Sequence, residues 1–271
     1  MKDLIIIRGG GDLATGTIHK LYKCGFSVLV LEVRNPSAIR RNVAFSEAVY
    51  DDQHTVEAVT CYRADSIARA KSLLRDGKLT VLVDPEGTAI SELHPLAVVD
   101  AILAKKNLGT TKDMAPITVA LGPGFEAGVN VDAVIETNRG HNLGRVLWSG
   151  CAEPNTGIPG IIGGFGKERV LYSPVEGVLR NICKITDTVR KGDIIAEVEN
   201  EHGRTPIPAT SDGLLRGLIR DGYPVSKGFK IADIDPRLDE YQNCFTISDK
   251  SRCIAGGVVE AILHLKGERG L

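Results

Sequence analysis

Residues 4–16 read Leu4-Ile5-Ile6-Ile7-Arg8-Gly9-Gly10-Gly11-Asp12-Leu13-Ala14-Thr15-Gly16. The apolar run predicts a buried strand, the glycines predict a tight turn, and residues 13–23 predict a helix. The small residues fit the pattern G-x-G-x-x-G/A, which tightens a turn and brings backbone close to a phosphate. The helix would direct its free N–H groups and positive dipole end at that anion. The stretch therefore predicts a phosphate or nucleotide site made by Gly9, Gly10, Gly11, Asp12, Ala14, Thr15 and Gly16.

A second apolar strand, residues 26–33, carries an acid near its end. Glu32 lies about 20 residues after the glycines, where a carboxylate accepts hydrogen bonds from ribose hydroxyls. Arg34 follows in the same loop and completes the predicted binding residues. Two further arginines in this loop, Arg40 and Arg41, favour a second phosphate over a hydroxyl. The alternative is a glycine-rich turn of an α/β fold with no bound nucleotide.

Strands alternate with helical stretches up to about residue 165. Further strands are expected at residues 47–50, 79–83, 116–121, 133–136 and 145–148, and helices at 66–74 and from Pro95 onward. This alternation is typical of a mostly parallel sheet covered by helices. We therefore predict an α/β fold, with a Rossmann-like phosphate-binding or nucleotide-binding domain over residues 1–166.

The residues that follow each strand are the next candidates, because ligands of open α/β sheets bind at the carboxyl ends of the strands. Arg139 is a candidate anion clamp, His141 a general base or ligand, and Cys151 a nucleophile or soft metal ligand. Asp84 or Glu126 would be a hydroxyl or metal partner. The competing interpretations are a solvated loop histidine and a cysteine that acts as a small hydrophobe.

Composition excludes several classes of protein. The 271 residues are 43% hydrophobic and 25% charged with a net charge of −1, which disfavours a nucleic-acid partner. No apolar run reaches the roughly 18 residues of a membrane helix, and no signal peptide is evident. The six cysteines form no C-x-x-C pair or zinc-type spacing, so we expect reduced thiols and no metal site. A cytoplasmic protein with no membrane partner is expected.

The last third of the chain contains an internal repeat. After a glycine-rich boundary at residues 155–166, Ser173–Arg180 matches Ala209–Arg216 and Val189–Val198 matches Val225–Ile234, both with an offset of 36 residues. The phrasing resembles the biotinyl/lipoyl-type barrel-sandwich fold, so we expect a small all-β barrel-sandwich-hybrid domain over residues 167–240. Its central hairpin, residues 200–205, has no lysine, which excludes covalent biotin or lipoate. Residues 241–271 are expected to form a helix that packs back on the first domain.

Four motifs together resemble one family, the selenium-dependent molybdenum hydroxylase system proteins, which are YqeB-like accessory proteins. The motifs are residues 8–16, 39–51, 135–145 and 154–160. The resemblance implies a role in maturation of molybdenum hydroxylases, with the hydroxylase as client protein. It also implies a phosphate-bearing ligand such as a molybdopterin-type cofactor, a nucleotide or selenophosphate. It carries over no catalytic residue.

The leading hypothesis is that the first domain binds the phosphate-bearing molecule while Arg139, His141 and Cys151 approach its reactive end. A noncatalytic chaperone that docks the hydroxylase through its β domain is the alternative. An NAD(P)-dependent oxidoreductase is a weaker one, because no tyrosine-lysine or histidine-acid pairing is recognisable. Whether a reaction is catalysed is left open, as is the number of subunits, a homo-oligomer included.

Overall fold

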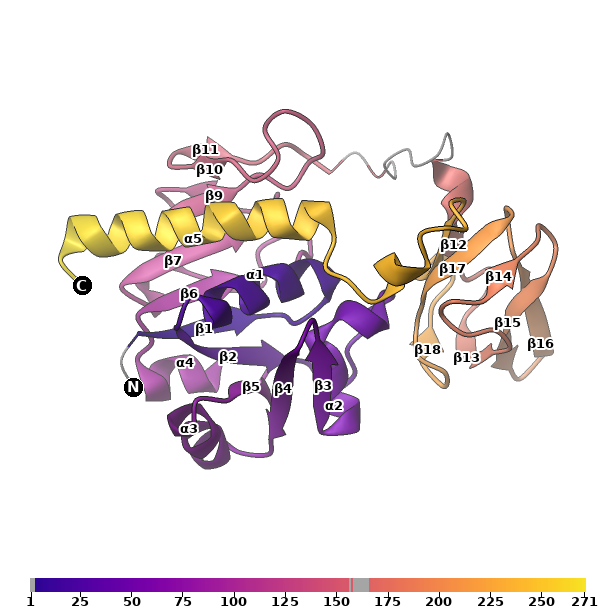
Figure 1. Ribbon diagram of the computed structural model, residues 1–271, viewed down its shortest axis with the longest axis horizontal. Helices are drawn as coiled ribbons and strands as arrows, with labels where there is room; N and C mark the ends of the chain where they lie inside the picture. The colour runs from indigo at the N-terminus through magenta and orange to yellow at the C-terminus, as the bar shows by residue number, and fades with distance from the viewer. Residues whose placement is uncertain (1–2, 156, 158–165) are drawn as a thin grey trace. The chain divides into compact units, whose positions relative to one another are not determined.

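The computed structural model describes residues 3–155, 157 and 166–271. Its contacts divide the chain into two compact units (Figure 1). Unit 1 comprises Met1–Pro36, Ala44–Thr156 and Ile247–Leu271, and unit 2 comprises Ser37–Val43 and Gly157–Thr246. Each unit is therefore assembled from segments that are distant in the sequence.

The core of unit 1 is a nine-stranded sheet with the order β10-β9-β7-β6-β1-β2-β5-β4-β3. Neighbours from β9 to β4 are parallel, whereas the edge strands β10 and β3 are antiparallel to their neighbours. The central strands are buried on both faces, as apolar runs of parallel strands usually are. The nine strands are β1 (Leu4–Arg8), β2 (Ser27–Glu32), β3 (Gln53–Val56), β4 (Val59–Ala64), β5 (Leu79–Val83), β6 (Ala97–Asp100), β7 (Ile117–Leu121), β9 (Ala133–Ile135) and β10 (Val146–Leu147). A separate antiparallel pair joins β8 (Glu126–Ala127) to β11 (Gly150–Cys151).

Two helices of unit 1, α1 (Asp12–Lys23) and α5 (Asp249–Arg269), run side by side along the sheet (Figure 1). Their contact is close at Gly16, where an added Cβ would lie 2.2 Å from Ser251 Oγ. The hydroxyl of Ser248 begins α5 by accepting the N–H of Ser251, as a helix cap does. The shorter helices of this unit are α2 (Ala48–Asp51), α3 (Ile67–Arg75), α4 (Thr88–Leu93), and the 3-10 turns η2 (Phe45–Glu47) and η3 (Lys112–Met114). No helix in the described part of the chain is long and apolar enough to cross a membrane.

The Rossmann-like prediction for this unit is wrong. The sheet is mixed, and the connections from β6 to β7 and from β7 to β9 contain only η3 and β8 where successive βαβ units would have α-helices. The helix expected from Pro95 is instead strand β6, because residues 97–100 are all buried and form a two-sided core strand. A short apolar run does not distinguish a buried strand from a buried helix. The strand expected at residues 47–50 is likewise helical, within η2 and α2.

Unit 2 consists of two four-stranded antiparallel sheets, with the orders β12-β19-β17-β14 and β16-β15-β13-β18. The strands are β12 (Val170–Tyr172), β13 (Gly177–Asn181), β14 (Thr188–Val189), β15 (Ile194–Asn200), β16 (Gly203–Pro208), β17 (Gly213–Leu218), β18 (Pro224–Val225) and β19 (Lys230–Asp235). Three 3-10 turns, η1 (Arg41–Val43), η4 (Lys167–Arg169) and η5 (Tyr241–Cys244), complete it. The inward faces share one apolar core.

The 36-residue offset of the repeat recurs in this architecture. Gly177 and Gly213 both have a positive φ, +152° and +154°, and a Cβ on either would lie 2.5 Å from a backbone oxygen of Glu199 or Asp235. Strand β18 of the second half pairs with β13 of the first, and β14 of the first half pairs with β17 of the second. Each sheet therefore needs a strand from the other half.

The predicted barrel-sandwich-hybrid fold is also corrected. Unit 2 is two separate antiparallel sheets, and it incorporates residues 37–43 from far upstream in the chain. The repeat pattern contains nothing that indicates this upstream segment, because the segment lies outside the repeat and joins it only through tertiary contacts.

Candidate functional site

The glycine-rich turn after β1 is packed against neighbouring backbone on most of its surface. A Cβ on Gly9 would lie 3.0 Å from the carbonyl oxygen of Ala101, and one on Gly10 would lie 3.1 Å from the amide nitrogen of Ser46. The N–H of Ser46 donates to the Gly10 carbonyl at 2.9 Å. Only Gly11 of these three glycines faces open space, since an added Cβ there meets no atom of a described residue within 4 Å.

The side chain of Glu32 is tied to this turn. Its two carboxylate oxygens accept the N–H groups of Gly10 and Val33, each at 2.8 Å. Burial raises the pKa of Glu32, and these two hydrogen bonds oppose the rise. Glu32 therefore stabilises the turn through these two hydrogen bonds without the help of a ligand.

The other predicted binding residues serve different ends. Thr15 directs its hydroxyl to the Gly11 carbonyl at 2.9 Å, and Ala14 is buried. Gly16 lies where α1 contacts α5, and Arg34 is exposed. Ligand binding at this turn, by Gly9 to Gly16 with Glu32 and Arg34, stays a prediction. Arg40 and Arg41 belong to unit 2, where they donate to backbone carbonyls of Asn243, Thr246 and Leu218.

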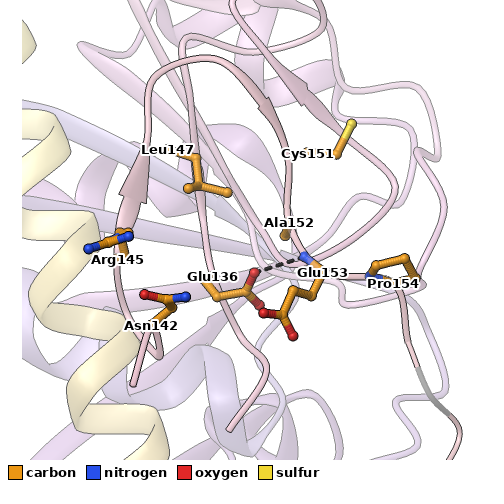
Figure 2. Close-up of a pocket in the computed structure, with 8 residues that line it drawn as sticks. All are labelled: Glu136, Asn142, Arg145, Leu147, Cys151, Ala152, Glu153 and Pro154. Carbon is orange, nitrogen blue, oxygen red and sulfur yellow. Dashed lines mark hydrogen bonds between the residues drawn. The ribbon is translucent and has the colours of Figure 1, made fainter. Parts of the chain in front are cut away.

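A cavity of about 460 Å³ lies at the carboxyl end of β9 (Figure 2). Glu136 directly follows that strand and is buried. Its carboxylate accepts the N–H of Asn138 at 2.6 Å and the N–H of Glu153 at 2.8 Å, so it joins the loop after β9 to the loop after β11. The cavity is lined by Glu136, Asn142, Arg145, Leu147, Cys151, Ala152, Glu153 and Pro154.

The polar groups of this cavity gather at one side. Figure 2 shows the carboxylates of Glu136 and Glu153 and the amide of Asn142 near one another, whereas the sulfur of Cys151 points away from them. The amide of Asn138 donates to Glu153. Asn142 and Arg145 have no side-chain hydrogen bond or ion pair with any described residue, so both are available to a ligand.

Charged residues of the first turn of α5 adjoin the same loop. Arg139 pairs with Asp249 at 3.1 Å, and the sulfur of Cys253 donates to the Leu143 carbonyl at 3.1 Å. The pKa of Lys250 is lowered by burial and by Arg139, although Asp12, Glu136 and Asp249 oppose the shift. Asp12 at the start of α1 and Glu136 of the cavity therefore both act on Lys250 at the start of α5.

Sequence reasoning found part of this region and missed part. The structure brings Cys151 to the cavity wall and Arg139 to α5, while His141 is exposed and has no partner among the described residues. Asp84 accepts the N–H groups that open α4, at 2.7–3.1 Å, which is a structural role. No cluster of three metal-ligating side chains occurs among the described residues. The missed lining residues are Glu136, Asn142, Arg145 and Glu153, of which Glu136 carried the same signal as Glu32, an acid at the end of an apolar strand.

No protein-family model matches the chain. It is 52% identical over 262 residues to the uncharacterized protein YqeB of Escherichia coli K12, a match that covers 97% of this chain and 48% of that protein. The chain is thus YqeB-like in sequence and spans about half the length of this curated relative.

Three solved structures align over most of the chain. They are an ectoine utilization protein from Ruegeria pomeroyi (10% identity, TM-score 0.27, 86% of this chain and 85% of that one), an aspartoacylase family protein from Mesorhizobium loti (14%, 0.31, 86% and 85%) and a succinylglutamate desuccinylase/aspartoacylase from Rhodobacter sphaeroides (11%, 0.29, 87% and 85%). At TM-scores of this size they assign the chain neither a fold nor an activity.

The predicted role in maturation of selenium-dependent molybdenum hydroxylases is corrected, because YqeB, which is 52% identical to this chain, is named without a function and supplies no such role. The molybdenum and selenium context came from the family resemblance alone, and no residue of the site requires it. The hydroxylase-docking alternative falls with it, and the oxidoreductase alternative loses the Rossmann-like fold on which it depended.

Proposed function

We propose that unit 1 binds a small polar molecule in the cavity lined by Glu136, Asn142, Arg145 and Glu153. The observation that supports this most directly is the position of the cavity at the carboxyl end of a parallel strand, where two loops bring together carboxylate, amide and guanidinium groups. Glu136 positions the loops, because both of its oxygens accept backbone N–H groups.

The lining favours a ligand with two kinds of polar group. The guanidinium of Arg145 has no partner in the described protein and suits a carboxylate. Glu153 and Asn142 offer oxygen acceptors for an amine or a hydroxyl. Leu147, Ala152 and Pro154 supply a short apolar wall. A small amino acid or hydroxy acid meets all three requirements.

Calorimetric titration of the full chain with a panel of amino acids and hydroxy acids tests this proposal. Arg145→Met should weaken binding of every acid in the panel by about 10- to 100-fold, the value of a charge-assisted hydrogen bond. Glu153→Gln should weaken amino acids more than hydroxy acids, because it removes the charge opposite an ammonium group. Arg75→Met and Glu92→Gln, exposed positions on α3 and α4, are the matched controls and should change nothing. Absence of binding across the panel, or binding that neither cavity variant weakens, would refute the proposal.

A further inference from the structure

The two repeats of unit 2, a first half that begins at Ser173 and a second half that begins at Ala209, differ in the residues that cover them. On the second half, Ile39–Arg41 lies against the end of β17. The N–H of Leu218 donates to the Ile39 carbonyl at 2.9 Å, and Arg41 Nε donates to the Leu218 carbonyl at 2.7 Å. Gly217 leaves room for this segment, because an added Cβ would lie 2.7 Å from Ile39 Cγ2. Leu218 and the next residue, Ile219, are consequently fully buried.

The equivalent place on the first half has no such cover from any described residue. Ile182, 36 residues before Leu218, is 59% exposed, and Ile194 beside it is 38% exposed. Cys183, the counterpart of Ile219, is half-buried, and its sulfur lies 3.9 Å from the carbonyl oxygen of Ile194. Asn181 stands where the second half has Gly217, and its Oδ1 is buried with no hydrogen-bond partner among the described residues.

Carboxylates surround this uncovered place. Asp187 and Asp193 both act electrostatically on the thiol of Cys183, and the carboxylate of Asp221 accepts the N–H of Asn181 at 2.7 Å. The carboxylates of Asp187 and Asp193 accept only the backbone N–H groups of Lys184 and Arg190, respectively, among the described residues. Neither aspartate is neutralised by an ion pair with a described cation, so each is available to a cationic side chain.

We propose that the surface formed by Asn181, Ile182, Cys183 and Ile194 docks a short segment of a partner protein in which an aliphatic residue precedes one or two arginines. The segment Ile39-Arg40-Arg41 shows how such a sequence seats on the related half. The aliphatic side chain covers Ile182 and Ile194, and an arginine meets Asp187 or Asp193.

A fluorescent peptide with the sequence of residues 36–43 is the probe, titrated into the full chain and followed by anisotropy. Binding is expected, and Ile182→Asp should weaken it at least about tenfold, the value of desolvating most of an aliphatic side chain. The same loss is expected when the isoleucine of the peptide becomes aspartate, and raised salt should weaken binding further. Leu238→Asp, at another exposed apolar position of unit 2, is the matched control and should leave the affinity unchanged.

Three results would overturn the proposal. The first is absence of binding at millimolar peptide. The second is binding that Ile182→Asp does not affect, which would mean that the peptide exchanges with residues 37–43 on the second half. The third is self-association of the full chain, seen by sedimentation and abolished by Ile182→Asp, which would identify a second copy as the occupant. Because Ile182 is exposed, its replacement should leave the fold intact, which circular dichroism verifies.

Discussion

Replacing Gly16 by alanine should destabilise the protein, although alanine is the better helix former. The new Cβ would lie 2.2 Å from Ser251 Oγ and 2.8 Å from the Ser251 carbonyl, so α1 and α5 must separate or the serine must move. Overpacking of this kind costs about 1–3 kcal/mol. Displacing the Ser251 hydroxyl also breaks its bonds to the Gly16 N–H at 3.1 Å and the Leu13 carbonyl at 2.8 Å, which adds about 1 kcal/mol. Helix propensity returns about 1 kcal/mol. The net loss in free energy of unfolding is about 1–3 kcal/mol.

Urea denaturation of the full chain measures this loss. Gly267→Ala, in helix α5, is the control: its Cβ would meet no atom of a described residue within 4 Å, so the variant should gain up to about 1 kcal/mol in free energy of unfolding. Ser251→Ala removes the nearest clashing atom, so the double variant should lose less than the sum of the single ones by about 1 kcal/mol. If Gly16→Ala is as stable as the parent protein, the close contact between α1 and α5 is not what requires glycine here.

Three further predictions concern stability and reactivity. Burial raises the pKa of Asp235, but the hydrogen bonds of Arg237 and Arg216 and the charge of Arg237 outweigh burial and lower the pKa to about 2. The stability that the ionised Asp235 provides is therefore complete above about pH 4 and is lost as the pH falls toward 2. Asp235→Asn should therefore cost about 2 kcal/mol at pH 7 and flatten the acid limb of a pH–stability curve; an unchanged limb would contradict this. Thr186 has a φ of +90° at the position where the second half has Gly222. Thr186→Gly should therefore raise the free energy of unfolding by about 1 kcal/mol in a denaturant titration. A lower free energy of unfolding would show that the threonine is unstrained. Burial raises the pKa of the Cys61 thiol. In a thiol-labelling assay Cys61 should therefore stay unlabelled until the chain unfolds, whereas the exposed Cys24, Cys151 and Cys253 should react in the native protein.

The elements that the sequence predicts well are those whose signal is local. Buried apolar runs identify β1, β2, β5 and β7, and the glycines place the start of α1 within one residue. The hairpin of β3 and β4 was missed because its turn consists of Glu57 and Ala58, both with positive φ. Asn and Gly are the usual residues of such a turn, so nothing in the sequence marks this one.

The site was harder to predict than the strands. Glu136 holds its two loops through backbone N–H groups of residues 2 and 17 positions away, and such bonds leave no sequence pattern. Gly9, Gly11 and Ala14 fit a phosphate fingerprint, yet in the structure Gly9 permits close contact with Ala101, as the neighbouring Gly10 does with Ser46 and Gly16 with Ser251, and of the three fingerprint residues Gly11 alone faces space that no described residue fills. A glycine indicates that other atoms lie close to its backbone, but it does not indicate whether those atoms belong to a ligand or to the protein itself.

The discontinuous make-up of both units sets the order in which the chain can finish folding. Residues 37–43 are synthesised early, but the end of β17 that they contact exists only after residue 218 has been made. At about 5–20 residues per second, that interval is roughly 10–35 s. Unit 1 waits longer still, because α1 is covered by α5, which the ribosome delivers after all of unit 2. A nascent chain therefore leaves the side of α1 that α5 covers open to solvent until the residues of α5 have been made.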